Sequence, residues 1–274
     1  MLTFPINPLD RAMDWDLLHR SVVSIFDSYH APEQDVLIEV IQNSVDAIEE
    51  RAIEASKNKE KFVPEIRIRI DTAKNALEIH DNGVGVPESI LQQLGSPHNT
   101  SKKSGRRRGH KGVGLTYVAW STEKFRFATR HANSKQPYAG LLAGASDWVQ
   151  DGGGPCPVIR EDSAYAKELI PGPSGASFFF QFPPAARVLS TFRRLTAGGQ
   201  EVFLRTKTAI GNVDLPHVDE KDVDDWISRA RVSVVVDNGL PQELLGLNGV
   251  PRCLQRALLR RQHDPATLRQ GRWS

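Results

Sequence analysis

The residues best suited to chemistry fall in three short segments of the first 120 residues. The first segment places Glu39, Asn43 and Asp46 at helical spacing and continues into Ala47. Residues three and four apart lie on one face of a helix. There an amide oxygen can coordinate a hard cation such as Mg²⁺, and a carboxylate one turn earlier can take a proton from an attacking water. Taken alone, the pattern is more often a solvated polar face.

The second segment is Asp81-Asn82-Gly83-Val84-Gly85, directly after the alternating stretch 76–80. Asn-Gly is also typical of a tight hairpin turn. The next stretch, 87–94, has a helical pattern, so a simple hairpin fits less well. An aspartate at the end of a buried strand can accept a hydrogen bond from the exocyclic amine of adenine, and glycines allow the base to approach the backbone.

The third segment places Gly109, Gly112 and Gly114 at a junction between a loop and a helix. Backbone N–H groups at a helix N-terminus bind phosphate. The preceding residues 102–111 carry six Lys or Arg and no acid, which fits a solvated loop, a nucleic-acid patch or a group that neutralises a triphosphate. Residues 95–112 lack apolar periodicity and are interpreted as a lid loop.

Hydrophobic periodicity predicts the elements that position these segments. Helices are expected at 14–28, 32–57, 87–94 and 113–120, a basic helix at 251–261, and strands at 65–70, 76–80, 124–129, 138–143, 176–182, 201–208 and 232–236.

Composition limits the class of protein. Hydrophobic residues make up 39% and charged residues 25% of the 274 residues, as in ordinary globular domains. No apolar run is long enough for a membrane span, and the N-terminus does not resemble a signal peptide. The only cysteines, Cys156 and Cys253, suit a reducing compartment, so a cytoplasmic location is expected. The net charge of +2 hides a basic segment 251–274 and an acidic segment 214–225.

The three segments together resemble the GHKL ATPase superfamily of gyrase, the ninety-kilodalton heat-shock chaperone, histidine kinases and MutL. "EVIQNSVDAIEE" resembles the asparagine box, "IHDNGVGV" the adenine-binding glycine box and "GHKGVGLTYV" the phosphate-binding glycine box. The MutL, MORC and heat-shock branches are the most similar. The resemblance implies an α+β, Bergerat-type sandwich with a mixed, mostly antiparallel sheet and helices on one face. We expect this ATP-binding domain at 1–185 and a C-terminal extension, or partial transducer-like domain, at 186–274.

The resemblance also implies roles for single residues. Glu39 would be the general base and Asn43 the Mg²⁺ ligand. Asp46 would line the nucleotide pocket, with Ala47 packed beneath it. Asp81 would bind adenine, beside a wall shaped by two glycines. The remaining cofactor contacts implied are Gly83, Gly85, Thr100, Ser101, Lys102, Gly109, His110, Lys111, Gly112, Val113 and Gly114.

The chain departs from the family pattern in two places. Relatives usually carry Gly-Thr at the start of the late strand, whereas this chain has Gly175-Ala176-Ser177. Ser177 is a candidate replacement for the missing hydroxyl only if the register shifts by one residue, which would turn it to the other face. Hydrolysing relatives also receive a lysine or arginine from a following domain. Lys207 is a candidate, and an exposed strand lysine is the alternative.

The implied function is a Mg²⁺-dependent switch that binds and hydrolyses ATP. We expect a homodimer through the ATPase domain and a DNA or separate effector-protein partner, with no membrane partner. Bacterial DNA maintenance and antiviral (phage) defence use such modules, which is an analogy at the level of fold. The alternatives are a nucleic-acid-binding module that uses the basic lid and C-terminal helix, and a nucleotide-sensing scaffold without turnover.

Overall fold

The computed structural model describes residues 15–27, 29, 32–91, 114–132, 134, 136–152, 156–212, 230–237, 239 and 242–244. The predicted lid at 95–112 and the predicted basic helix at 251–261 lie outside the described residues. Among the described residues, no helix is long and apolar enough to cross a membrane.

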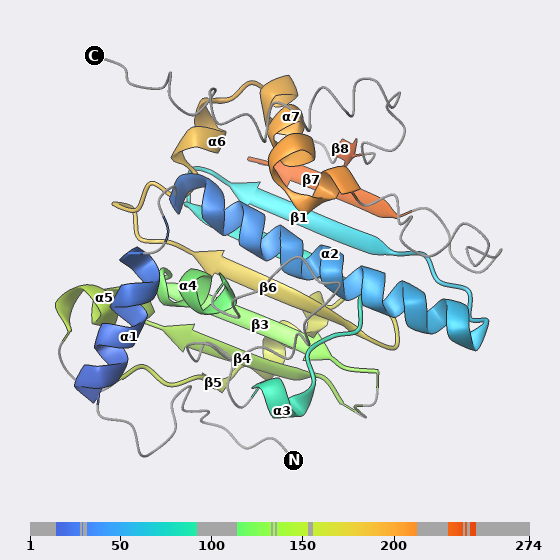
Figure 1. Ribbon diagram of the computed structural model, residues 1–274, viewed down its shortest axis with the longest axis horizontal. Coiled ribbons are helices and arrows are strands. Elements are labelled where there is room, and N and C mark those ends of the chain that lie inside the picture. The colour runs from blue at the N-terminus through green and yellow to red at the C-terminus, as the bar shows by residue number, and fades with distance from the viewer. Residues whose placement is uncertain are drawn as a thin grey trace.

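The strands of the described segments form one eight-stranded sheet in the order β5-β4-β3-β6-β2-β1-β7-β8 (Figure 1). Only β1 and β7 pair in parallel, and the other neighbours are antiparallel. The strand bounds are β1 (Glu65–Asp71), β2 (Ala76–Asp81), β3 (Lys124–Arg130), β4 (Tyr138–Ala143), β5 (Arg160–Glu161), β6 (Gly175–Gln181), β7 (Arg231–Val236) and β8 (Gln242–Leu244).

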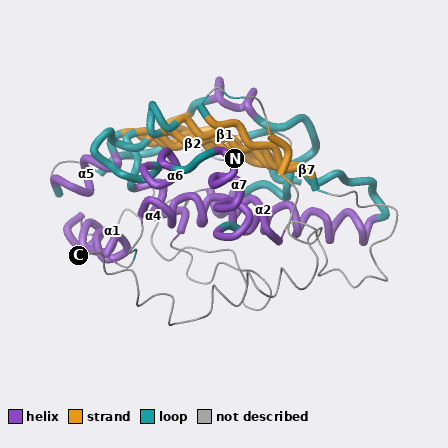
Figure 2. Tube along the Cα trace, turned by 90° about the horizontal axis from the view of Figure 1, so that it is seen from above, coloured by secondary structure: helices purple, strands orange, loops and turns teal. Residues whose placement is uncertain are grey.

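The α-helices gather on one face of this sheet, and Figure 2 shows them as a layer below the strands. The expected α+β fold with a mostly antiparallel sheet is therefore confirmed. The helix bounds are α1 (Trp15–Asp27), α2 (Pro32–Asn58), α3 (Glu88–Leu91), α4 (Gly114–Trp120), α5 (Ala145–Asp151), α6 (Ser190–Arg194) and α7 (Ala197–Lys207), with short 3-10 helices η1 (Ser163–Glu168) and η2 (Ala209–Asn212).

Helix α2 is the element around which the core is built. Its apolar stripe includes Leu37, Ile41 and Ile48, which are all fully buried. The opposing strands present their alternate residues to this helix, such as Ile68 of β1 and Ile79 of β2, which pair directly. Alternating strands and a helical stripe thus bury each other, as the periodicity predicts.

Aromatic residues extend the core under the neighbouring strands. Phe125 and Phe127 of β3 pair with Phe180 and Phe178 of β6. The rings of Phe125 and Phe180 stack with centroids 5.1 Å apart. Such cross-strand aromatic pairs stabilise a sheet by more than the burial of their apolar area alone. They therefore strengthen the pairing of β3 with β6 beside β2.

The opposite face of the sheet is only partly covered. The helix η1 packs there over β3 and β4, where Tyr165 joins Ala128 and Ala139 in a small buried cluster. Arg126 forms an ion pair with Asp162 at 2.6 Å and lies over the Tyr165 ring. The two faces of the sheet therefore differ: the α-helices cover one face, and η1 covers part of the other.

The prediction of a strand at 201–208 is wrong, because these residues belong to helix α7. The helix begins after Thr196, whose side-chain oxygen accepts a hydrogen bond from the Gly199 N–H at 3.2 Å. This N-cap signal precedes two glycines that lower helix propensity and obscure the pattern. Lys207 consequently ends a helix and is not part of a strand.

Strands β7 and β8 continue the sheet beyond the predicted boundary near residue 185. The turn after β1 is tied to the end of β7 by Asp237, which accepts hydrogen bonds from the Thr72 N–H at 2.6 Å and the Thr72 hydroxyl at 2.7 Å. Buried residues of 186–212 and of strands β7 and β8 thus belong to the same core as the earlier elements. Whether residues 186–274 act as a separate functional unit stays a prediction.

This tie predicts that Asp237→Ala lowers the free energy of unfolding by about 1–3 kcal/mol, because Thr72 loses both acceptors. Asp237→Asn is the matched control: it keeps an acceptor oxygen, and asparagine tolerates the positive φ of 47° at this position. Chemical denaturation of both variants measures the difference. Equal stability of the two variants would contradict the role given to the carboxylate.

Candidate functional site

The centre of the candidate site is the carboxylate of Asp81 at the end of β2. It is 1% exposed and faces helix α2, whose Ser44 hydroxyl donates to Oδ2 at 3.0 Å. The Gly83 N–H donates to Oδ1, also at 3.0 Å. The residue therefore connects the second sequence segment to the helix that carries the first.

Burial raises the pKa of Asp81 to about 7, although hydrogen bonds from Gly83, Ser44 and the Ala176 backbone act in the opposite direction. A carboxylate offers about four lone-pair positions, so three donors leave capacity for one more. An additional N–H donor would favour the ionised form. The environment of Asp81 thus suits an amine donor of the kind that adenine carries.

The glycines after Asp81 allow the chain to pass close to two other elements. A Cβ at Gly83 would lie 2.7 Å from the Cβ of Ala47, and the Val84 N–H donates to the Ala47 carbonyl at 3.2 Å. Gly85 has a φ of +70°, and a Cβ there would collide with the Arg130 carbonyl. Only glycine fits both positions, because the chain passes close to Ala47 and Arg130. The approach of a base to these glycines stays a prediction.

Thr129 is a buried residue of the site that the sequence did not single out. It pairs with Ala176, which in turn pairs with Asp81, so the three form a row across β3, β6 and β2. Its hydroxyl accepts from the Val86 N–H at 2.7 Å and donates to the Gly175 carbonyl at 3.2 Å. Alternation after Phe125 and Phe127 would have placed it on this face.

Ser177 lies on the opposite face of β6. Its hydroxyl donates to the Glu168 carbonyl at 2.9 Å and lies 3.0 Å from Nδ1 of His80. Because its single proton is given to the carbonyl, the His80 ring must donate to it. The register is thus unshifted, and the structure does not bring Ser177 together with Asp81. Ala176, which pairs with Asp81, has no hydroxyl to offer there.

The predicted general base lies against the start of helix α4. A Cβ at Gly114 would collide with Oε2 and Cδ of Glu39. Helices α2 and α4 pack directly on each other, which places the last glycine of the third segment beside the first residue of the first segment. The structure therefore places Glu39 beside Gly114. Their spacing in the sequence does not predict this contact.

The other polar residues of α2 extend the same helix. Asp46 is buried and accepts a hydrogen bond from the Gln42 side chain at 2.7 Å. Asn43 is partly buried between Glu39 and Asp46. The remaining predicted cofactor residues lie outside the described part of the chain: Thr100, Ser101, Lys102, Gly109, His110, Lys111, Gly112 and Val113.

The described residues contain no cluster of three or more His, Cys, Asp or Glu side chains placed to hold a metal ion. A Mg²⁺ ion that binds with nucleotide needs few protein ligands, because phosphate oxygens and waters complete its coordination. Asn43 offers an amide oxygen on the helix that carries Glu39. The donor set therefore fits a nucleotide-bound Mg²⁺ better than a metal held by protein alone.

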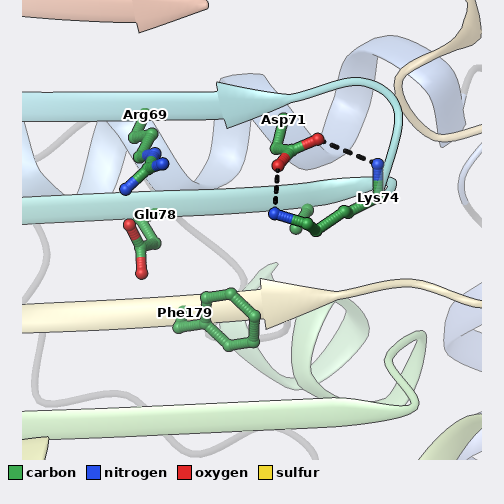
Figure 3. Close-up of a pocket in the computed structure, with 6 residues that line it drawn as sticks. Arg69, Asp71, Lys74, Glu78 and Phe179 are labelled. Carbon is green, nitrogen blue, oxygen red and sulfur yellow. Dashed lines mark hydrogen bonds and ion pairs between the residues drawn. The ribbon is translucent and has the colours of Figure 1, made fainter. Parts of the chain in front are cut away.

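A hollow on the opposite face of the sheet is separate from this site. It is lined by Arg69, Asp71, Lys74, Ala76, Glu78 and Phe179 (Figure 3). Asp71 forms an ion pair with Lys74 at 2.9 Å, and Arg69 lies across from Glu78 in the β1–β2 register. This hollow is near the β1–β2 turn, at the other end of β2 from Asp81, so it takes no part in the site.

The raised pKa of Asp81 predicts that stability depends on pH. The folded protein holds this proton more tightly than the unfolded chain, so the contribution of Asp81 to stability is greatest below pH 4 and is lost as pH rises to about 7. Asp81→Asn should remove that loss, making the apo variant at least as stable as wild type at pH 8. Thermal unfolding at pH 5 and 8 measures the difference. A variant that is less stable by the same amount at both pH values would contradict it.

Comparison with known proteins agrees with this geometry. Residues 32–184 match the family model described as histidine kinase-, DNA gyrase B- and HSP90-like ATPase. The chain is also similar to the chaperone protein HtpG of Rhodococcus jostii (strain RHA1), with 24% identity over 189 residues. That match covers 62% of this chain and 26% of the relative, so the chain spans only part of the relative's length.

The family match begins with helix α2 and ends just after strand β6, so it contains Glu39, Asp81 and Gly114. More than half of the chain lies within it. The chain therefore belongs to the histidine kinase-, DNA gyrase B- and HSP90-like ATPase family.

Proposed function

We propose that this chain is an ATP-binding switch that hydrolyses ATP, with Glu39 as the general base and Asp81 as the adenine-binding residue. Family membership supports ATP binding. The observation that carries the rest is that one helix, α2, holds both ends of the site: Ser44 bonds Asp81, and Glu39 lies against Gly114.

The adenine side of the proposal rests on Asp81 and the loop after it. The carboxylate is buried and already ordered by Ser44 and Gly83. A preorganised acceptor in a dry site binds an N–H donor better than a mobile surface group does. The following loop is held by two hydrogen bonds, from the Val84 N–H to the Ala47 carbonyl and from the Val86 N–H to the Thr129 hydroxyl. Ala176 supplies no hydroxyl beside Asp81, so base selectivity would depend on the carboxylate.

The hydrolytic side rests on the position of Glu39. Its carboxylate lies at the first residue of α4, and the terminus of that helix follows the predicted phosphate-binding glycines. A general base must reach the water that attacks the terminal phosphate. When bound, Mg²⁺ would offset phosphate charge, and Asn43 is the residue proposed to contact it. Glu39 then accepts the proton of the water, while the helix dipole favours the phosphate at the N-terminus.

The purpose of the cycle is proposed to be remodelling of a DNA or protein partner, with association of two ATPase domains. Basic residues 102–111 support an anionic ligand near the glycines. The nucleic-acid-binding alternative differs in one measurable respect, because its DNA affinity would be salt-dependent and persist without ATP.

Two substitutions separate binding from turnover. Glu39→Ala should retain ATP affinity and lose at least about 100-fold in phosphate release, because the proton acceptor is removed. Asp81→Asn should lose measurable ATP binding, because an NH2 donor replaces one of the two acceptor oxygens that face the amine of adenine. Calorimetric titration and a phosphate-release assay measure the two properties.

Normal hydrolysis by Glu39→Ala would show that the base is another residue. Binding of ATP by the wild type without phosphate release would favour the nucleotide-sensing alternative. Retained binding by Asp81→Asn, with an intact fold, would remove the proposed adenine contact.

A second test uses the close contact at the start of α4. Gly114→Ala should lower turnover by about 10-fold or more, because the added Cβ would displace the Glu39 carboxylate. Alanine favours a helix over glycine by about 1 kcal/mol, so lost helix propensity would not explain the effect. Gly198→Ala in α7 is the matched control, since a Cβ there meets no atom within 4 Å. Equal activity of both variants would contradict the placement of Glu39.

A further inference from the structure

We infer that Tyr29 is a positioning residue that holds the Glu39 carboxylate for water activation; this inference rests on the proposed function. Tyr29 lies between helices α1 and α2, and its hydroxyl donates to Oε1 of Glu39 at 3.3 Å. The other carboxylate oxygen lies toward Gly114. Tyr29 therefore holds one carboxylate oxygen of Glu39 from outside helix α2, while the other oxygen lies beside the start of α4.

The Tyr29 ring is itself held in place. It stacks on the Tyr117 ring with centroids 3.8 Å apart and planes 8° apart. Phe26 packs against the other part of this cluster, edge-on to Tyr117 at 5.1 Å, and its carbonyl accepts from the Tyr29 N–H at 3.1 Å. Aromatic packing of this kind restricts a side chain at low entropy cost, so the phenol points at Glu39 in a defined direction.

Tyr117 links this contact to the phosphate side of the site. It is 3% exposed and follows Gly114 by three residues in α4. The Tyr29–Tyr117 stack therefore ties the hydroxyl that orients Glu39 to the helix that begins beside the same carboxylate. A displacement of α4 would move both contacts of Glu39 together.

The direction of the hydrogen bond is settled by chemistry. An ionised carboxylate can only accept, so the phenol donates. Burial, followed by the neighbouring charge of Glu39, raises the pKa of Tyr29, which keeps the hydroxyl protonated at working pH. The distance of 3.3 Å is long for an O–H···O bond. A modest contribution to turnover is therefore expected, smaller than that of Glu39 itself.

Tyr29→Phe tests the inference because it deletes the hydroxyl and keeps the stacked ring. The expected result is a kcat lowered by about 3–10-fold, with KM and the ATP dissociation constant unchanged within about twofold. Removing a donor to the ionised carboxylate also favours its protonated form. The acid limb of the kcat profile should therefore move to higher pH.

Tyr138→Phe is the matched control. The Tyr138 hydroxyl donates to Oε2 of Glu88 at 2.9 Å, so this variant also removes a tyrosine–glutamate hydrogen bond, away from Glu39. Its kcat and its pH profile should equal those of the wild type. Equal kcat for Tyr29→Phe and wild type, or a loss in Tyr29→Phe that is entirely in ATP affinity, would overturn the inference.

A measurement without nucleotide separates this inference from the proposed function. Thermal unfolding of Tyr29→Phe, Glu39→Ala and the double variant gives a double-mutant cycle. The Tyr29→Phe shift in melting temperature should be smaller in the Glu39→Ala background, and additive shifts would overturn the contact. Absence of turnover in the wild type would contradict the proposed function and the inference with it. Turnover that is insensitive to Tyr29→Phe would contradict the inference alone.

Discussion

The site depends on the burial of one carboxylate. Asp81 is removed from water at the end of β2, and its ionised form is costly there unless donors surround it. Helix α2, the loop after β2 and strand β6 each supply one such donor. Three elements are thus held in register by a group that destabilises the fold when it is ionised. Such an expense in stability is typical of residues kept for binding.

Sequence patterns predicted most elements because the periodicities were strong. The α2 stripe and the alternation in β1 belong to long segments with one buried face, and their bounds agree with the structure to within one or two residues. The helix at 197–207 was mistaken for a strand because two glycines follow its N-cap and only Leu204 is fully buried. Short elements such as η1 and β8 carry too few residues for any period to show.

The residues of the candidate site also differ in whether the sequence alone reveals them. The sequence singles out Glu39, Asp81 and the glycines as candidates, because each has a chemistry that is tied to a local motif. It does not single out Ser44, since its hydroxyl acquires a role only when β2 lies beside it. Tyr29 has no local signal, because its partner Glu39 and its stacking partner Tyr117 are brought to it by tertiary packing. Long-range contacts of this kind are not visible in spacing.

The parallel pairing of β1 with β7 has a consequence for how the chain reaches this structure. Glu65 pairs with Arg231 across most of the described chain, so this contact has a high loop-closure cost and is expected to form late in folding. Until then β1 is an edge strand with unpaired backbone groups, a template for association between chains. A fragment ending at residue 184, where the family match ends, would keep that edge permanently open. Arg67 and Arg69 on β1 are exposed, and charged side chains on an open edge strand oppose aggregation of such a fragment.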